Sequence, residues 1–250
     1  MKPFFKPLLL TAACAFGVLT LSAQAPYRTA PEQAPQQQQN HGAEIDPQLL
    51  LAAKDALALL KSKEGIFVDV RSRFEYNAEH IQNAISFPYK AISMTNRFPF
   101  PKDKDLIMYC GCPHHLSGMS AEILKKQGYS RVKVINEGYW GWKQMGFPIV
   151  QGPPEALKRI SQAIDGRLVD ARQQPVAYRD VFVEHLPTGQ LEATRTDAQG
   201  RFHMQLHFAA VAPGEKLAVG LKNTTLARLS LSEMEKPLHL SLPLETALKP

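Results

Sequence analysis

The sequence contains little cysteine, and its cysteines are not spread along the chain. Only three of the 250 residues are cysteine, Cys14, Cys110 and Cys112. Exported domains that are held together by disulfides carry several well-separated cysteines, so this chain is not a disulfide scaffold. Two cysteines one residue apart in a single loop instead favour reactive thiol chemistry.

Two further absences each exclude a class of partner. After the first 23 residues, no stretch approaches the roughly 18–20 apolar residues that a membrane helix needs. The chain also has no run of lysine and arginine interleaved with aromatic residues, so its net charge of +6 makes no case for nucleic acid. We therefore expect neither a membrane span nor a nucleic-acid partner.

Residues 1–23 have the features of a secretory signal peptide. Lys2 and Lys6 precede a largely apolar segment at 8–21, and small residues lead to Ala23. Removing the segment takes these two lysines and no acid, which lowers the net charge from +6 to +4. For a bacterial chain this predicts export to the periplasm. Residues 24–44 are rich in proline and glutamine and are expected to form a disordered tether.

Residues 45–151 alternate between strand and helix patterns. Strands are expected at 66–70, 84–87, 106–109 and 132–135, and helices at 46–60, 74–80, 89–94, 116–127 and 139–145. This alternation predicts an α/β domain whose parallel sheet has helices on both faces. Ligands of such sheets bind beyond the carboxyl ends of the strands, which is where Cys110 lies.

A second domain is predicted at 166–250, after a linker at 152–165. Short strand patterns separated by turn residues lie at 167–170, 179–186, 191–196, 201–208, 216–221 and 238–242. They predict an antiparallel β-sandwich. The phrases Gly166–Asp170, Pro175–Tyr178 and Thr196–Phe202 resemble a carboxypeptidase-regulatory-like domain, which implies binding or bracing.

Three histidines in this second domain raise the question of a metal site. His203 and His207 are four residues apart on one strand and so share a face, with His185 as a potential neighbour. We interpret them as solvated strand residues and assign the domain no chemistry.

The candidate nucleophile is Cys110, which ends a buried strand and precedes a tight loop and a helix. The helix N-terminus is partially positive, and a loop that curls over the sulfur directs several N–H groups at it. Both effects favour the thiolate, which is the reactive form. The alternative is a buried structural cysteine.

The rest of the active loop is predicted to bind the substrate. Its two histidines add charge or protons, and its N–H groups hold a sulfur oxyanion. Two cysteines and two histidines within six residues are too closely spaced for the usual zinc arrangement, so no metal or other cofactor is expected. The loop residues are Gly111, Cys112, Pro113, His114, His115, Leu116 and Ser117.

Several phrases within 45–151 carry a family resemblance: Phe67–Arg71, Glu79–Ile81, Asn83–Ile85 with Pro88, Tyr109–Cys110, and Glu137–Trp142 closing on Gly146–Ile149. Together they resemble the rhodanese (sulfurtransferase) domain. The resemblance implies that Cys110 takes a sulfane sulfur from a small donor such as thiosulfate. The resulting persulfide then passes to a thiol or to cyanide.

The resemblance also gives Asp69 and Arg71 a supporting role near the site. They lie two apart on one strand and face the same side, so Arg71 pairs with Asp69 or with Glu75. Trp140 and Trp142 are interpreted as core residues, with Trp140 at the edge of the pocket.

The active loop departs from the family pattern because it is about one residue longer and contains no arginine. A phosphate dianion would lack its bidentate partner there, so phosphatase and arsenate reductase activities rank below sulfur transfer. A non-catalytic rhodanese-fold binding module, with the sandwich as its adhesive part, is one alternative. A thiol-disulfide redox protein that uses Cys110 and Cys112 is another.

The role of Cys112 stays open between three readings. It is a spectator, a resolving cysteine that forms a disulfide with Cys110, or a sulfur carrier itself. A resolving role requires a periplasmic reductant, and the sandwich offers a surface for a protein partner. The enzymatic interpretation as a whole requires that the Cys110 sulfur be reachable.

Overall fold

The computed structural model describes residues 45–111, 113–152 and 159–243. The predicted signal peptide and tether at 1–44 and the second loop cysteine, Cys112, lie outside these residues. All the described residues belong to one structural unit of the chain. Within them, no helix has the length and apolar character required to cross a membrane.

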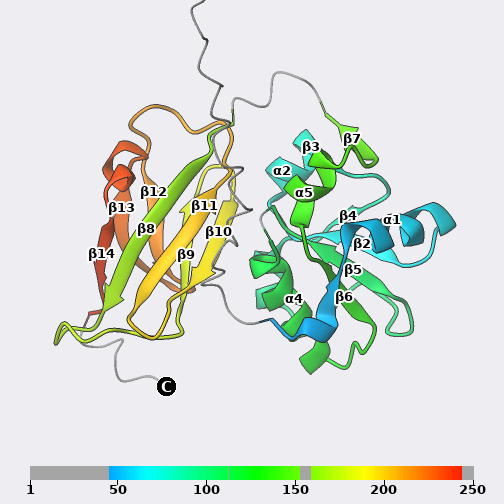
Figure 1. Ribbon diagram of the computed structural model, residues 1–250, viewed down its shortest axis with the longest axis horizontal. Helices are drawn as coiled ribbons and strands as arrows, with labels where there is room; N and C mark the ends of the chain where they lie inside the picture. The colour runs from blue at the N-terminus through cyan, green and yellow to red at the C-terminus, as the bar shows by residue number, and fades with distance from the viewer. Residues whose placement is uncertain (1–44, 112, 153–158, 244–250) are drawn as a thin grey trace, which may run out of the picture. The chain divides into compact units, whose positions relative to one another are not determined.

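A five-stranded parallel sheet forms the centre of the first half of the described chain (Figure 1). In spatial order its strands are β1 (Leu50–Leu51), β6 (Val132–Ile135), β5 (Leu106–Tyr109), β2 (Ile66–Asp69) and β4 (Ile85–Ser86). Every neighbouring pair is parallel. The central strand β5 has neighbours on both sides and is fully buried, which is why its sequence is a continuous apolar run.

Five helices cover this sheet, α1 (Ala53–Ser62), α2 (Arg73–Ala78), α3 (Tyr89–Met94), α4 (His115–Lys126) and α5 (Gly138–Gln144). Successive residues of the strands enter different apolar clusters. Val68 and Met108 pack in one cluster, whereas Phe67 and Ile107 pack in the other. Both faces of the sheet are therefore buried, and the predicted α/β domain is confirmed.

The helix expected at 46–60 is wrong in its first part. Pro47–Leu49 form a 3-10 turn, and Leu50 and Leu51 then pair with Val134 and Ile135 as the edge strand β1 before α1 begins. The segment 74–80 is likewise helical only to Ala78, because Glu79–Ile81 form strand β3, which pairs with β7 (Ile149–Gln151).

The second half contains two facing sheets. One has the order β10 (Gln190–Arg195), β9 (Asp180–His185), β12 (Leu217–Leu221) and β13 (Thr224–Leu229), and the other β11 (Arg201–Leu206), β8 (Gln162–Val169) and β14 (Leu238–Ser241). Ile164 and Leu168 of one sheet share an apolar cluster with Val181 and Val219 of the other. This arrangement is a β-sandwich, as predicted, although β14 pairs with β8 in parallel.

Two predictions for this half need correction. The linker expected at 152–165 ends earlier, because β8 begins at Gln162 and pairs with β11 along its first six residues. Strand β13 was not expected, because its residues carry no clear apolar alternation and are only partly buried.

Candidate functional site

The active loop begins directly after the central strand β5. The carbonyl of Cys110 accepts a hydrogen bond from the N–H of Tyr139 (2.8 Å), and that of Gly111 accepts one from Trp140 (3.2 Å). The first turn of α5 thus holds the start of the loop. The chain enters α4 at His115, after His114 in a left-handed conformation (φ 41°). The predicted order of strand, loop and helix is present.

The side chain of Cys110 is fully buried. Its Sγ lies 3.3 Å from the hydroxyl oxygen of Ser117, which sits in the first turn of α4 and is itself buried. The expectation that the sulfur is reachable is therefore wrong in this structure. Phe182 and Ala193 of the sandwich belong to the same buried cluster as Cys110, so strands of the second domain help to cover it.

The predicted cradle of N–H groups around the sulfur depends on a loop that includes Cys112, which is outside the described residues. Ser117 provides a hydroxyl group at the sulfur. Leu116 points into the core, whereas Pro113 is exposed to solvent.

The two loop histidines do not supply the predicted charge. Burial lowers the pKa of His114, and it lowers the pKa of His115 to about 4. Both rings are therefore neutral at pH 7. Their cover includes Asp180 and Arg195 of the sandwich, which line the same small cleft. The sandwich, which lies far along the chain, thus contributes to the burial that lowers the pKa of these two histidines.

Asp69 and Arg71 form a buried ion pair at the end of β2. The guanidinium Nη2 lies 2.6 Å from Asp69 Oδ2, and Nε lies 3.0 Å from Oδ1. The guanidinium also stacks on the ring of Tyr139, at 3.9 Å from its centroid. Of the two predicted partners of Arg71, Asp69 is the observed one. The pair connects β2 to the helix that anchors the active loop.

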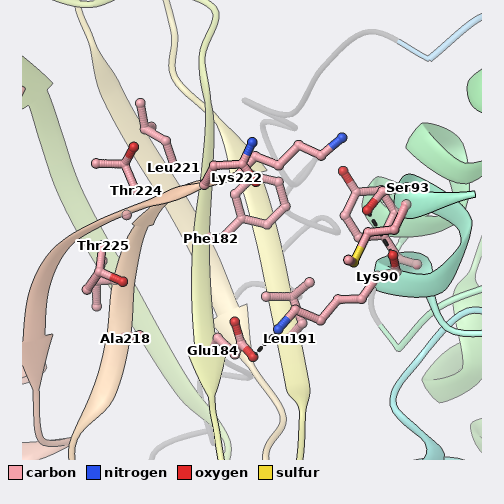
Figure 2. Close-up of a pocket in the computed structure, with 15 residues that line it drawn as sticks. Lys90, Ser93, Phe182, Glu184, Leu191, Ala218, Leu221, Lys222, Thr224 and Thr225 are labelled. Atoms are coloured by element: carbon pink, nitrogen blue, oxygen red, sulfur yellow. Dashed lines mark hydrogen bonds and ion pairs between the residues drawn. The ribbon is translucent and has the colours of Figure 1, made fainter. Parts of the chain in front are cut away.

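A cavity of about 370 Å³ lies away from this loop. α3 lines it on one side and strands of the four-stranded sheet on the other, and Figure 2 shows Lys90 reaching Glu184 within it. Lys222, Thr224 and Thr225 are among its other lining residues. None of the predicted site residues lines this cavity, so it does not serve the candidate nucleophile.

The sandwich histidines have separate environments. His203 is exposed and pairs with Asp165 (2.9 Å), and His185 contacts Thr188 (2.7 Å). His207 is half-buried against Trp140, with ring centroids 5.3 Å apart. The solvated interpretation therefore fails for His207 and for His185, which is fully buried. Across the residues that the structure describes, no cluster of three or more His, Cys, Asp or Glu side chains is placed to hold a metal ion.

Sequence reasoning missed one acidic residue beside the loop. Glu192 of β10 is buried, and its Oε1 lies 3.4 Å from the position that a Cβ on Gly111 would occupy. In the sequence it reads as a solvent-facing strand residue, and nothing local to it indicates contact with residue 111.

Comparison with known proteins agrees with this geometry. Residues 52–145 match the family model of the rhodanese-like domain. An Escherichia coli protein named thiosulfate sulfurtransferase PspE is 34% identical over 87 residues, which are 34% of this chain and 79% of that protein. An uncharacterized Synechocystis protein is 31% identical over 121 residues, 48% of this chain and 66% of that protein.

A solved structure gives a similar match. The rhodanese-like domain of the Alr3790 protein from Anabaena is 24% identical, with a TM-score of 0.39 over 43% of this chain and 81% of that one. Against the first curated relatives, the matched part of the chain spans less than two thirds of their length, from 66% down to 31%.

Proposed function

The chain belongs to the rhodanese-like family, and on that premise we propose that it is a periplasmic sulfurtransferase with Cys110 as its nucleophile. One observation carries the proposal. The only cysteine at the carboxyl end of the central strand, among the described residues, is hydrogen-bonded to a hydroxyl group on the helix that follows. This position is the one at which parallel sheets bind their ligands.

The proposed reaction has two displacement steps. The Cys110 thiolate attacks the outer sulfur of a thiosulfate-like donor, the S–S bond of the donor breaks, and sulfite leaves with the electron pair. An acceptor thiolate or cyanide then attacks the outer sulfur of the Cys110 persulfide and releases the thiolate. The Ser117 hydroxyl donates a hydrogen bond to the sulfur whenever it carries negative charge.

Export is the second part of the proposal. It is supported by the basic start, the apolar segment and the small residues that end at Ala23. In an oxidising compartment, a reductant that keeps Cys110 reduced is also required.

The complete burial of Cys110 favours one competing function, a rhodanese-fold binding module without catalysis. A donor reaches the sulfur only when part of its cover moves away. In the module, the cover is permanent and the sandwich carries the binding surface.

The deciding experiment is a sulfur-transfer assay by intact mass. The reduced protein is incubated with thiosulfate, and we expect the mass to increase by one sulfur atom. The gain disappears in Cys110→Ser and remains in Cys112→Ser. No gain under any reducing condition favours the binding module, and turnover of a dithiol without any reaction with thiosulfate indicates a redox protein.

A further inference from the structure

Residues from outside the rhodanese domain gather around Trp140 at the rim of the active loop. The guanidinium of Arg159 lies over the indole, 4.5 Å from the ring centroid, and His207 packs against the same indole. The backbone of Arg159 forms an isolated bridge with Ala209, which holds this arginine beside the strand end that carries His207.

This cluster lies next to Gly111, the residue that follows the nucleophile Cys110. The indole Nε1 of Trp140 lies 3.1 Å from the position that a Cβ on Gly111 would occupy. The backbone of Trp140 also donates to the Gly111 carbonyl. The indole N–H is therefore fixed next to the residue that follows Cys110.

Three polar atoms of the cluster are buried and have no hydrogen-bond partner in the described part of the chain: Trp140 Nε1, Arg159 Nη1 and His207 Nδ1. The first two can only donate a hydrogen bond. A buried donor without an acceptor is costly and rare in folded proteins. Two of them in one cluster indicate that an acceptor from outside the chain belongs there.

The charges around the cluster are mixed: two cations lie beside it, and the buried carboxylate of Glu192 also lies next to Gly111. Glu79 is buried and pairs with both Lys143 (2.6 Å) and Arg159 (2.7 Å), so two cations share one carboxylate. Arg159 donates a hydrogen bond from Nη2 to Glu79 Oε1, and its Nη1 has no hydrogen-bond partner among the described residues. The active loop contains no arginine, so a cation beside it comes only from other segments.

We propose that Trp140 Nε1 and Arg159 Nη1, with His207 beside them, bind the oxyanion group of the sulfur donor, the sulfonate end of thiosulfate or of an organic thiosulfonate. The inference rests on the proposed sulfurtransferase function and assigns part of the substrate site to the segment that joins the domains and to the sandwich. The sulfane end of the bound donor points toward Cys110.

The first test measures binding without chemistry. Calorimetric titration of Cys110→Ser protein with thiosulfate is repeated in the added variants Trp140→Phe and Arg159→Gln. We expect each to raise the dissociation constant about tenfold to a hundredfold, as for the loss of a hydrogen bond to a charged group. Trp140→Phe removes an unpaired donor and keeps an aromatic ring under Arg159, so it keeps the fold.

Two matched variants serve as controls. Trp142→Phe changes the other tryptophan, whose Nε1 donates to the Pro148 carbonyl, and Arg131→Gln removes an exposed arginine that pairs with Asp105. Both are expected to leave thiosulfate binding within about twofold of the parent. Unchanged binding in Trp140→Phe and Arg159→Gln, or no binding by the parent, overturns the inference, because an ordered water then satisfies these donors.

The second test separates this inference from the proposed function. With Cys110 intact, Arg159→Gln is expected to raise KM for thiosulfate about tenfold or more, whereas the exposed control Arg131→Gln is expected to leave it within about twofold of the parent. Sulfur transfer with an unaltered KM for thiosulfate defeats the inference alone. Binding of thiosulfate that depends on Arg159, with no sulfur added to Cys110, supports the site and defeats the proposed function.

Discussion

Ser117 is the side chain whose removal tests the environment of the nucleophile most directly. Its hydroxyl lies 3.3 Å from Cys110 Sγ. We expect Ser117→Ala to slow persulfide formation on Cys110 about tenfold to a hundredfold, because a hydrogen bond to a charged group contributes about 1.5–3 kcal/mol. Stopped reactions analysed by intact mass measure the rate.

The same helix provides the control for this change. Ser120 is equally buried, and its hydroxyl donates to the Leu116 carbonyl (2.7 Å) rather than to the sulfur. Ser120→Ala is expected to leave the rate of persulfide formation unchanged. Equal losses in the two variants would show that packing of α4, and not the contact with sulfur, sets the rate.

His115 makes the protein sensitive to acid. Burial lowers its pKa from 6.5 to about 4, so between these values the unfolded chain binds a proton that the folded chain does not. Stability therefore falls as the pH drops from 6.5 to 4, by about 2 kcal/mol from this residue. We expect His115→Gln to flatten the fall in the free energy of unfolding between pH 7 and 4.5, measured with urea.

His239 supplies the comparison for the acid experiment. It is exposed on β14, so His239→Gln is expected to keep the pH dependence of the parent. If His115→Gln also keeps that dependence in full, the buried neutral state of His115 is wrong.

The sequence limited the partner of Arg71 to Asp69 or Glu75 because all three lie on one short segment, but β2 ends at Asp69, so the choice between them is made beyond the strand. The neutrality of the loop histidines and the burial of Cys110 could not be predicted. Both depend on cover from Phe182 and Ala193, which lie more than 65 residues further along the chain. No local pattern encodes such a contact.

Helix α2 depends on a reciprocal cap at its start. The hydroxyl of Ser72 accepts from the N–H of Glu75 (3.2 Å), and the Glu75 carboxylate accepts from the N–H of Ser72 (3.0 Å). Because α2 has only six residues, these two capping bonds are a large share of the hydrogen bonds that hold it. We expect Ser72→Ala to lower the free energy of unfolding by about 1–2 kcal/mol, measured with urea.

An exposed serine on a neighbouring helix tests whether this loss is specific to the cap. The hydroxyl of Ser62 at the end of α1 bonds only to the Leu59 carbonyl of its own last turn. Ser62→Ala is expected to change stability by less than about 0.5 kcal/mol. A similar small effect of Ser72→Ala would contradict a stabilising role of the cap.

Elements that are buried and strongly patterned were predictable in place and type. The strands at 106–109 and 132–135 and the helix at 89–94 have the expected bounds. The exceptions are elements whose partner decides their state. Leu50 and Leu51 fit a helical stripe equally well, and only pairing with β6 makes them a strand. Strand β13 likewise forms because its residues pair with β12.

The two halves of the described chain share apolar core, which the sequence does not reveal. Phe182 of β9 stacks on Tyr89 of α3, with ring centroids 6.1 Å apart, and joins the cluster that contains Cys110. Lys90 and Glu184 form an ion pair beside this contact. The sandwich is therefore part of the cover of the nucleophile, and we expect access to the sulfur to depend on its displacement.

Phe182→Ala tests this coupling. Loss of a buried aromatic ring costs about 3–5 kcal/mol, and here the cost falls on the closed arrangement of β9 and α3. Local opening then becomes more frequent, so we expect iodoacetamide to label Cys110 at least about tenfold faster under native conditions, as measured by peptide mass mapping.

Phe202→Ala removes a ring of similar burial from the sandwich interior, and it is expected to raise the labelling rate far less, because Phe202 belongs to the cluster without Cys110. Equal rates in the two variants would mean that Cys110 becomes accessible by unfolding of the sandwich itself, and the contact between Phe182 and Tyr89 would then have no part in gating the nucleophile.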